Sequence, residues 1–253
     1  MKTLVYDMGC GITAFSTGRD ADTVAGAGCY DGFNACHYTG DDPVHVDLCR
    51  RELIRSVDGI ECLVIPRQTH SLNVAVIDRE PAGQLVDVDA VVTASRGVAV
   101  AVNTADCVPV LLADPDAGVV AAVHSGWRGT VGHIVFKTLE SMVALGAVPG
   151  RVRAVMGPSI CTGCFEVGHE VAEEFEKAFP GVNEVVVYGA DAATRPHVGL
   201  RQAIRHDLEQ AGLHAGNIDT VSSPCSRCNP GEWWSARHIG VNSGRTLSLI
   251  MLK

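Results

Sequence analysis

Short apolar runs rich in β-branched residues recur along most of the chain. Each is only a few residues long, and glycine, proline or polar residues separate one run from the next. Such runs are typical of strands buried on both faces of a sheet. We therefore expect strands at residues 62–65, 73–77, 90–93, 98–102, 108–112, 119–123, 152–156, 184–188 and 246–252. The first 40 residues are rich in Gly, Asp and Ser/Thr and should alternate short strands with loops.

Four segments have the pattern of helices, at residues 43–56, 130–145, 167–179 and 200–212. The second should begin at Thr130, whose hydroxyl can cap a first turn, and stop at Gly146 and Pro149. Strands and helices are mixed without the strict alternation of a doubly wound sheet, which favours an α+β fold. The chain shows no internal repeat or evident linker, so we expect a single domain over residues 1–253.

Composition limits the classes of partner. Apolar residues make up 47% and charged residues 19% of the chain, an ordinary globular balance. The net charge of −9 disfavours binding to a nucleic-acid backbone. No apolar run reaches the roughly 18 residues of a membrane span, and the start of the chain lacks the pattern of a signal peptide. We expect a cytoplasmic protein that acts on a small molecule, with no nucleic-acid or membrane partner; nothing in the sequence indicates its oligomeric state.

Three residues could form a metal site. His124 follows the apolar run 119–123 and precedes a glycine-containing turn, and Cys107 and His70 also lie at the ends of predicted strands. If the three converge, two imidazoles and a thiolate would hold Zn²⁺ with a fourth position open, which is a catalytic arrangement. The alternative is a nucleophilic pair, in which Cys107 attacks and one histidine acts as the base.

The turn at residues 126–130 is a second candidate. A glycine-rich turn that enters a helix presents free backbone N–H groups, and Arg128 adds a positive charge, so the turn could hold phosphate or another anion. The alternative is a plain strand-to-helix turn with Trp127 in the core. Among carboxylates, Asp89 and Asp106 lie near the strand ends that carry the candidate ligands, so we rank them above Glu166 as groups that support the ligands.

Ten cysteines without a secretion signal favour free thiols over a disulfide framework. Two C-x-x-C pairs stand out, Cys161 with Cys164 and Cys225 with Cys228. A long stretch of chain separates the pairs, far more than in a compact zinc ribbon, so their spacing does not favour a shared metal site. A redox role is supported no better, because neither pair visibly opens a helix after a thioredoxin-like strand.

Several motifs in this order resemble one family. They include Gln68-Thr69-His70-Ser71, Thr104-Ala105-Asp106-Cys107-Val108-Pro109, Val123-His124-Ser125-Gly126-Trp127-Arg128-Gly129, Gly157-Pro158-Ser159-Ile160, Phe165-Glu166-Val167-Gly168, Trp233-Trp234-Ser235-Ala236-Arg237 and Ser243-Gly244-Arg245. Together they resemble the multicopper polyphenol oxidase (laccase)-like family, whose members are described as zinc-dependent purine nucleoside phosphorylases and in some cases as peptidoglycan editing factors. The resemblance covers nearly the whole chain.

The resemblance implies a single α+β domain with β-sheets packed between layers of helices. It places the metal ligands, which are also the catalytic residues, on His70, Cys107 and His124, with zinc as the expected metal and copper as a possible occupant in vitro. The implied reaction is phosphorolysis of adenosine, inosine, guanosine or methylthioadenosine, and several members also deaminate adenosine. The sequence does not favour the chemistry of a multicopper oxidase. Such an enzyme needs many histidines in paired clusters, and this chain has no H-x-H pair.

Purine nucleosides and phosphate are therefore the expected substrates. We expect Arg128, Arg237 or both to place the phosphate and Asp89 to belong to the same substrate site, while Trp127 or Trp233 could stack on the purine. Two other hypotheses use the same Cys/His centre. One is an amidase that acts on cell-wall precursors, and the other is a non-catalytic protein that holds zinc or copper in a regulatory complex.

The chain departs from the family pattern at two places. The N-terminal element of the family, S-T-R-x-G-G, is replaced here by Ser16-Thr17-Gly18-Arg19-Asp20. The closing element F-F-S-Y-R-R is replaced by Trp233-Trp234-Ser235-Ala236-Arg237-His238, with alanine in place of the tyrosine. The arginine of this element is kept as Arg237, so its role can be expected here, whereas a role of the tyrosine hydroxyl cannot.

Overall fold

A computed structural model describes residues 1–21, 26, 28–79, 81–189, 191, 194–219 and 223–253. Two large sheets form its centre. The first contains, in spatial order, β1 (Thr3–Val5), β2 (Ile12–Thr17), β13 (Thr246–Leu252), β6 (Val98–Thr104) and β3 (Cys62–Val64). The second contains β12 (Ile218–Asp219), β9 (Arg153–Met156), β7 (Val108–Asp114), β8 (Val119–Ser125), β5 (Ala90–Thr93) and β4 (Val74–Ile77). A small third sheet pairs β10 (Val186–Val187) with β11 (His197–Val198).

The central strands are buried along their whole length because each face of each sheet is covered. Side chains alternate between the two faces of a strand, so neighbouring residues of β6 enter different layers. Val100 packs between the two sheets with Leu111 and Val120 of the second sheet. Ala101 points to the outer face of the first sheet. The uninterrupted apolar runs in the sequence thus correspond to strands that are buried on both faces.

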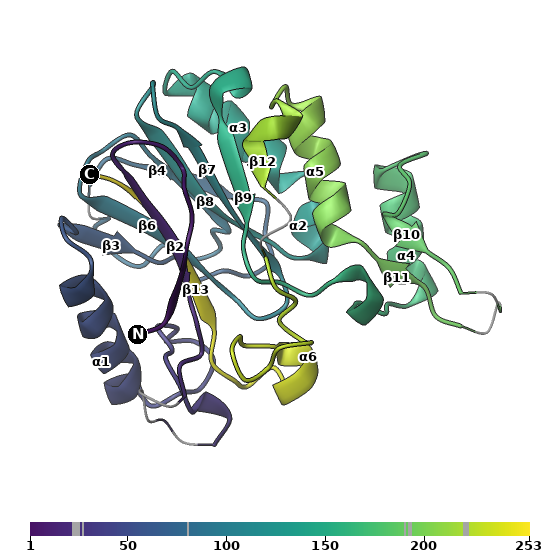
Figure 1. Ribbon diagram of the computed structural model, residues 1–253, viewed down its shortest axis with the longest axis horizontal. Helices are drawn as coiled ribbons and strands as arrows, with labels where there is room; N and C mark the ends of the chain where they lie inside the picture. The colour runs from purple at the N-terminus through teal and green to yellow at the C-terminus, as the bar shows by residue number, and fades with distance from the viewer. Residues whose placement is uncertain (22–25, 27, 80, 190, 192–193, 220–222) are drawn as a thin grey trace.

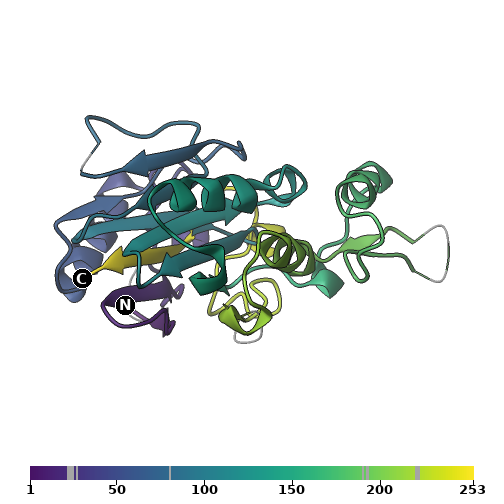
Figure 2. The ribbon, with the colours of Figure 1, turned by 90° about the horizontal axis from the view of Figure 1, so that it is seen from above.

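Helices cover both outer faces. The helix α1 (Pro43–Ser56) lies on the first sheet, where its Leu53 packs with residues of β2 and β13. On the second sheet, α3 (Ile134–Ala144), α4 (His169–Ala178) and α5 (Leu200–Gln210) share a core with β7 and β8. The result is two sheets between two layers of helices (Figures 1 and 2), which confirms the predicted α+β architecture. In Figure 1, α4 and the small sheet of β10 and β11 extend from one end of the molecule.

Short helices complete the chain. They are α2 (Trp127–Val131), α6 (Ala236–Ile239) and the 3-10 turns η1 (Gly28–Tyr30), η2 (Pro149–Arg151), η3 (Thr162–Cys164) and η4 (Ala215–Asn217). None of the helices in the described ranges is long and apolar enough to cross a membrane.

The predicted helix at residues 130–145 is wrong at its start. The structure breaks it into α2 and α3, because His133 adopts a left-handed conformation with a φ of 55°. Thr130 does not cap the helix: it lies inside α2, and its hydroxyl donates to the carbonyl of Gly126 at 2.9 Å. The strand expected at 184–188 is reduced to Val186–Val187. The other expected strands and helices are present, most with ends shifted by one or two residues.

Candidate metal centre

His70, Cys107 and His124 meet at one end of the two sheets. Cys107 lies in the turn between β6 and β7, His124 near the end of β8, and His70 in the loop between β3 and β4. The sulfur of Cys107 is 3.8 Å from Nε2 of His70. One ligand atom from each residue lies within 4.8 Å of the other two, a spacing at which all three can reach one ion.

The local backbone holds these three side chains close together. β7 and β8 pair antiparallel with Pro109 opposite His124, which brings the turn that carries Cys107 beside His124. Position 126 requires glycine: a Cβ there would lie 2.8 Å from the His70 ring and 3.0 Å from the Cys107 sulfur. His70 itself has a φ of 63°, in the left-handed region that non-glycine residues adopt only when surrounding contacts enforce it.

Asp89 supplies the contacts that hold the histidines. Its carboxylate is fully buried and accepts a hydrogen bond from Nδ1 of His124 at 2.6 Å. It also accepts the backbone N–H groups of Thr69, His70 and Ser71 at 2.8–3.2 Å. With Nδ1 held by Asp89, Nε2 is the atom of His124 that can bind a metal in exchange for its proton, the usual arrangement of a metal-ligating histidine and its carboxylate partner.

The electrostatic interactions within the site favour the charged forms of Cys107, His124 and Asp89. Burial by itself raises the pKa of the Cys107 thiol, but His124 and His70 lower that pKa to about 6. Burial lowers the pKa of His124, whereas the Cys107 sulfur and Asp89 raise it to about 9. The pKa of Asp89 falls to about 2: burial raises it, and the hydrogen bond and charge of His124 lower it further than burial lifts it. Cys107 is therefore a thiolate near neutral pH, the form that binds metal and attacks electrophiles.

A cavity of about 620 Å³ opens over the three ligands. Apolar surface comes from Trp127, Phe165 and Ile160, and positive charge comes from Arg237 and Arg245. The remaining lining residues are Tyr38, Thr39, Gln68, Asn103, Thr104, Ala105, Asp106, Ala236, Val241 and Asn242. Such a mixture of a flat apolar surface and a few charged groups suits a small ligand with an aromatic part and an anionic part.

Both arginines of the cavity are held in place by the backbone. The guanidinium of Arg237 lies 5.5 Å from the Phe165 ring and donates to the carbonyl of Glu166 at 3.0 Å. Its backbone N–H donates to Asp106 Oδ2 at 2.6 Å. Arg245 donates to the carbonyls of neighbouring loop residues at 2.7–2.9 Å. Their charges are thus pre-positioned at the cavity.

Asn103 places a buried side-chain amide beside the cavity. Its side chain is buried, and neither its amide oxygen nor its amide nitrogen has a hydrogen-bond partner within the described ranges. An unpaired buried amide is costly unless a ligand or water pairs with it. Sequence reasoning missed Asn103 because it is the penultimate residue of an apolar strand, and it noted Arg245 only as part of a motif.

Residues 13–253 match the family model described as multi-copper polyphenol oxidoreductase laccase. The chain belongs to this family. Adenosine deaminase RL5, from an unknown prokaryotic organism, is 46% identical over 252 residues, which cover 96% of this chain and 95% of the relative. A purine nucleoside phosphorylase of Bacteroides thetaiotaomicron is 36% identical over 89% of this chain and 86% of the relative.

Two solved structures have the same fold as this chain. A protein of Neisseria meningitidis is 30% identical, with a TM-score of 0.89 and complete coverage of both chains. YlmD of Geobacillus stearothermophilus is 26% identical, with a TM-score of 0.89 over 98% of this chain and 94% of that one.

Two of the expected substrate contacts lie elsewhere. Arg128 is exposed on α2, with its guanidinium 4.3 Å from the centre of the Trp127 ring, and it does not line the cavity. Asp89 lies behind the histidines, where its oxygens are already hydrogen-bonded. Of the two tryptophans considered for stacking, Trp127 lines the cavity, whereas Trp233 is buried and is absent from its lining.

At the two places where the sequence departs from the family pattern, one residue lies away from the cavity and the other lines it. Arg19 does not line the cavity: it donates to the carbonyls of Asp31 and Pro230, and its guanidinium lies 4.6 Å from the Trp234 ring. Ala236 does line the cavity, and as alanine it offers the ligand no hydroxyl.

Proposed function

We propose that this protein is a zinc-dependent enzyme of nucleoside metabolism that splits purine nucleosides with phosphate and also deaminates adenosine. The observation that carries the proposal is a three-ligand Cys/His₂ centre at the floor of a cavity that also contains two fixed arginines. The names of the relatives support the same substrate class, since one is an adenosine deaminase and another a purine nucleoside phosphorylase.

Zinc suits the donor set better than copper. One thiolate and two imidazoles with an open fourth position are typical of catalytic zinc. A blue-copper site uses the same three ligands with a weak axial methionine or glutamine. Among the described residues no methionine lines this cavity, and the amide of Gln68 is already hydrogen-bonded to the Asn103 backbone through both its nitrogen and its oxygen. Zinc bound by His70, Cys107 and His124 supplies a Lewis acid or a bound water of lowered pKa.

The protein side chains bind and orient the substrates. Arg237 and Arg245 hold the phosphate through charge-assisted hydrogen bonds, which are strongest to anions. Trp127 and Phe165 pack against the purine, a contact that aromatic side chains make with little loss of conformational freedom.

The two reactions need different second reactants. In phosphorolysis, a phosphate oxygen forms a bond to the anomeric carbon as the bond to the base nitrogen breaks, giving free base and ribose 1-phosphate. In deamination, water replaces the amino group of adenine and ammonia leaves, so phosphate is not consumed. The deaminase activity is included because the relative named for it is 46% identical over almost the whole chain.

The test uses zinc-loaded protein and adenosine, with and without added phosphate. We expect adenine and ribose 1-phosphate only when phosphate is present, and inosine in both conditions. The proposal would be overturned if adenosine, inosine, guanosine and methylthioadenosine all released no free base and adenosine gave no inosine. Release of an amino acid from a cell-wall precursor would then indicate an amidase, and tight metal binding without any turnover would indicate a non-catalytic metal-binding protein.

A further inference from the structure

The two C-x-x-C pairs, which are far apart in the sequence, meet in the fold. Cys161 and Cys164 lie at either end of η3, and Cys225 and Cys228 lie in the loop between β12 and α6. The four sulfurs lie within 4.8 Å of one another, and those of Cys164 and Cys228 are 3.5 Å apart. All four are free thiols, and none is fully buried. We refer to them as the four-cysteine cluster.

The spacing of these sulfurs matches a metal tetrathiolate. A tetrahedral Zn²⁺ site with Zn–S bonds of about 2.3 Å places its sulfurs about 3.8 Å apart. The 3.5 Å separation of Cys164 and Cys228 is close to that distance. The sequence spacing within each pair also matches, because two residues between cysteines are the usual separation in a structural zinc site.

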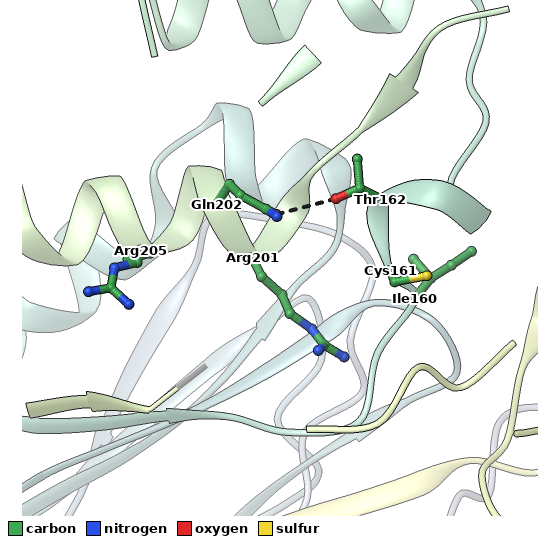
Figure 3. Close-up of a pocket in the computed structure, with 6 residues that line it drawn as sticks. All are labelled: Ile160, Cys161, Thr162, Arg201, Gln202 and Arg205. Carbon is green, nitrogen blue, oxygen red and sulfur yellow. Dashed lines mark hydrogen bonds between the residues drawn. The ribbon is translucent and has the colours of Figure 1, made fainter. Parts of the chain in front are cut away.

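The two loops are held together by contacts that need no metal. Ser159 and Cys225 form a parallel β-bridge, and the backbone N–H of Cys161 donates to the Cys225 sulfur at 3.3 Å. Arg201 extends from α5 beside Cys161 (Figure 3), and its guanidinium donates to Ser159 Oγ and to the carbonyls of Ser159, Ser223 and Pro224 at 2.7–3.0 Å. The cluster is therefore preorganised, which lowers the entropy cost of binding an ion.

We propose that the four-cysteine cluster is a second metal site, which binds Zn²⁺ as a closed tetrathiolate with a structural role. Four protein ligands leave no open position for water or substrate, in contrast to the centre at His70, Cys107 and His124. Binding exchanges the four thiol protons for the metal, and no electron is transferred. The proposal does not depend on the reaction assigned to the first centre.

A metal in the four-cysteine cluster would stabilise the part of the cavity wall that contains Asp106 and Arg237. The hydroxyl of Ser226, next to Cys225, donates to Asp106 Oδ1 at 2.7 Å. The other carboxylate oxygen of Asp106 accepts the backbone N–H of Arg237 at 2.6 Å. Asp106 also precedes the metal ligand Cys107 and has a φ of 87°, a conformation that needs outside support. A metal in the cluster fixes the loop that provides this support.

The experiment is a count of metal per chain by elemental analysis of protein purified under reducing conditions in zinc-supplemented medium. We expect two zinc ions per chain in the wild type. Cys164→Ser and Cys228→Ser should each lose one, and Cys107→Ser should lose the other. Cys10→Ser is the matched control, because Cys10 is exposed and belongs to neither group, and it should retain two.

Two further measurements use only the wild type, in case the cysteine variants do not fold. Cobalt substituted for zinc should show the intense sulfur-to-metal absorption of a tetrathiolate, and unfolding with a chelator under non-reducing conditions should release ten titratable thiols. The proposal would be overturned by a single zinc per chain that Cys107→Ser removes, by unchanged zinc in the Cys164 and Cys228 variants, or by a count of eight or fewer thiols. The last result would mean that the cluster forms a disulfide.

Discussion

Asp89 forms hydrogen bonds to both histidines of the candidate metal centre, a contact that no sequence pattern indicates. Its carboxylate receives Nδ1 of His124 and the backbone N–H groups of the loop that carries His70. One side chain thus orients the ring of His124 and holds the backbone that carries His70. Only the fold reveals this double contact, because Asp89 reaches a loop about twenty residues earlier in the chain.

Replacing this carboxylate should weaken the metal site. Asp89→Asn keeps the shape of the side chain but removes its charge, so we expect zinc affinity at the first centre to fall about 10–100-fold. Competition with a chromogenic chelator measures the change, in a Cys228→Ser background so that one site is titrated. Asp78→Asn, an exposed carboxylate remote from the centre, is the control. Equal affinities of the two variants would mean that Asp89 does not support the ligands.

At the level of elements, the strands that could be predicted from the sequence are the long ones that are buried on both faces. The strands β5, β6, β7, β8 and β13 are fully buried, and their apolar runs predicted them well. The short α6 and the strands β11 and β12 were not predicted, because two to four residues show no periodicity. The break before α3 was missed because it depends on a left-handed His133, whose ring contacts Asp207 on α5.

Asp114 links the β7–β8 turn to η2 and makes the stability of the fold depend on pH. Its side chain is fully buried, and burial alone would raise its pKa. The N–H groups of Val148 and Ala117 and the guanidinium of Arg151 instead hold the pKa below the ordinary value of 3.8. A pKa lower in the folded than in the unfolded state means that the carboxylate stabilises the fold above pH 3.8 and that this contribution is lost as the pH falls through the folded-state pKa.

Asp114→Asn tests this dependence. At pH 7 we expect the variant to be less stable than the wild type by about 1–3 kcal/mol, the cost of weakening several hydrogen bonds to a buried acceptor. The difference should begin to shrink as the pH falls below about 3.8, because the unfolded wild-type chain then takes up a proton that the folded carboxylate does not. Urea unfolding of both proteins from pH 7 to pH 3 measures it. A difference that stays constant over this range would contradict the assignment.

On the scale of the whole molecule, the fold brings together loops that the sequence places far apart. The convergence of His70, Cys107 and His124 could be predicted because each lies at or near a strand end. The cavity wall could not, because Arg245 and Asn103 approach it from strands and loops more than a hundred residues apart. The same limit applies to the four-cysteine cluster, whose two pairs are separated in the sequence by α4, α5 and the strands β10, β11 and β12.

The arginines separate the two proposed activities. Arg237→Ala and Arg245→Ala should each reduce phosphorolysis of adenosine about tenfold to a hundredfold, because a hydrogen bond to a charged group contributes about 1.5–3 kcal/mol. Deamination should change far less, since water rather than phosphate is the second reactant. Arg128→Ala is the matched control, because this arginine is exposed outside the cavity. Equal loss of both activities in the two cavity variants would mean that these arginines hold the loops rather than the anion.

The most direct test of the metal-dependent nucleoside chemistry compares wild-type protein with His124→Ala, both stripped by chelation and then titrated with zinc, with adenosine and phosphate as substrates. The wild type should regain formation of adenine and inosine as zinc is restored. The variant should regain neither product, because it lacks the buried ligand that Asp89 orients. Full turnover by stripped wild-type protein, or by the His124 variant at any zinc concentration, would contradict the assignment of this centre.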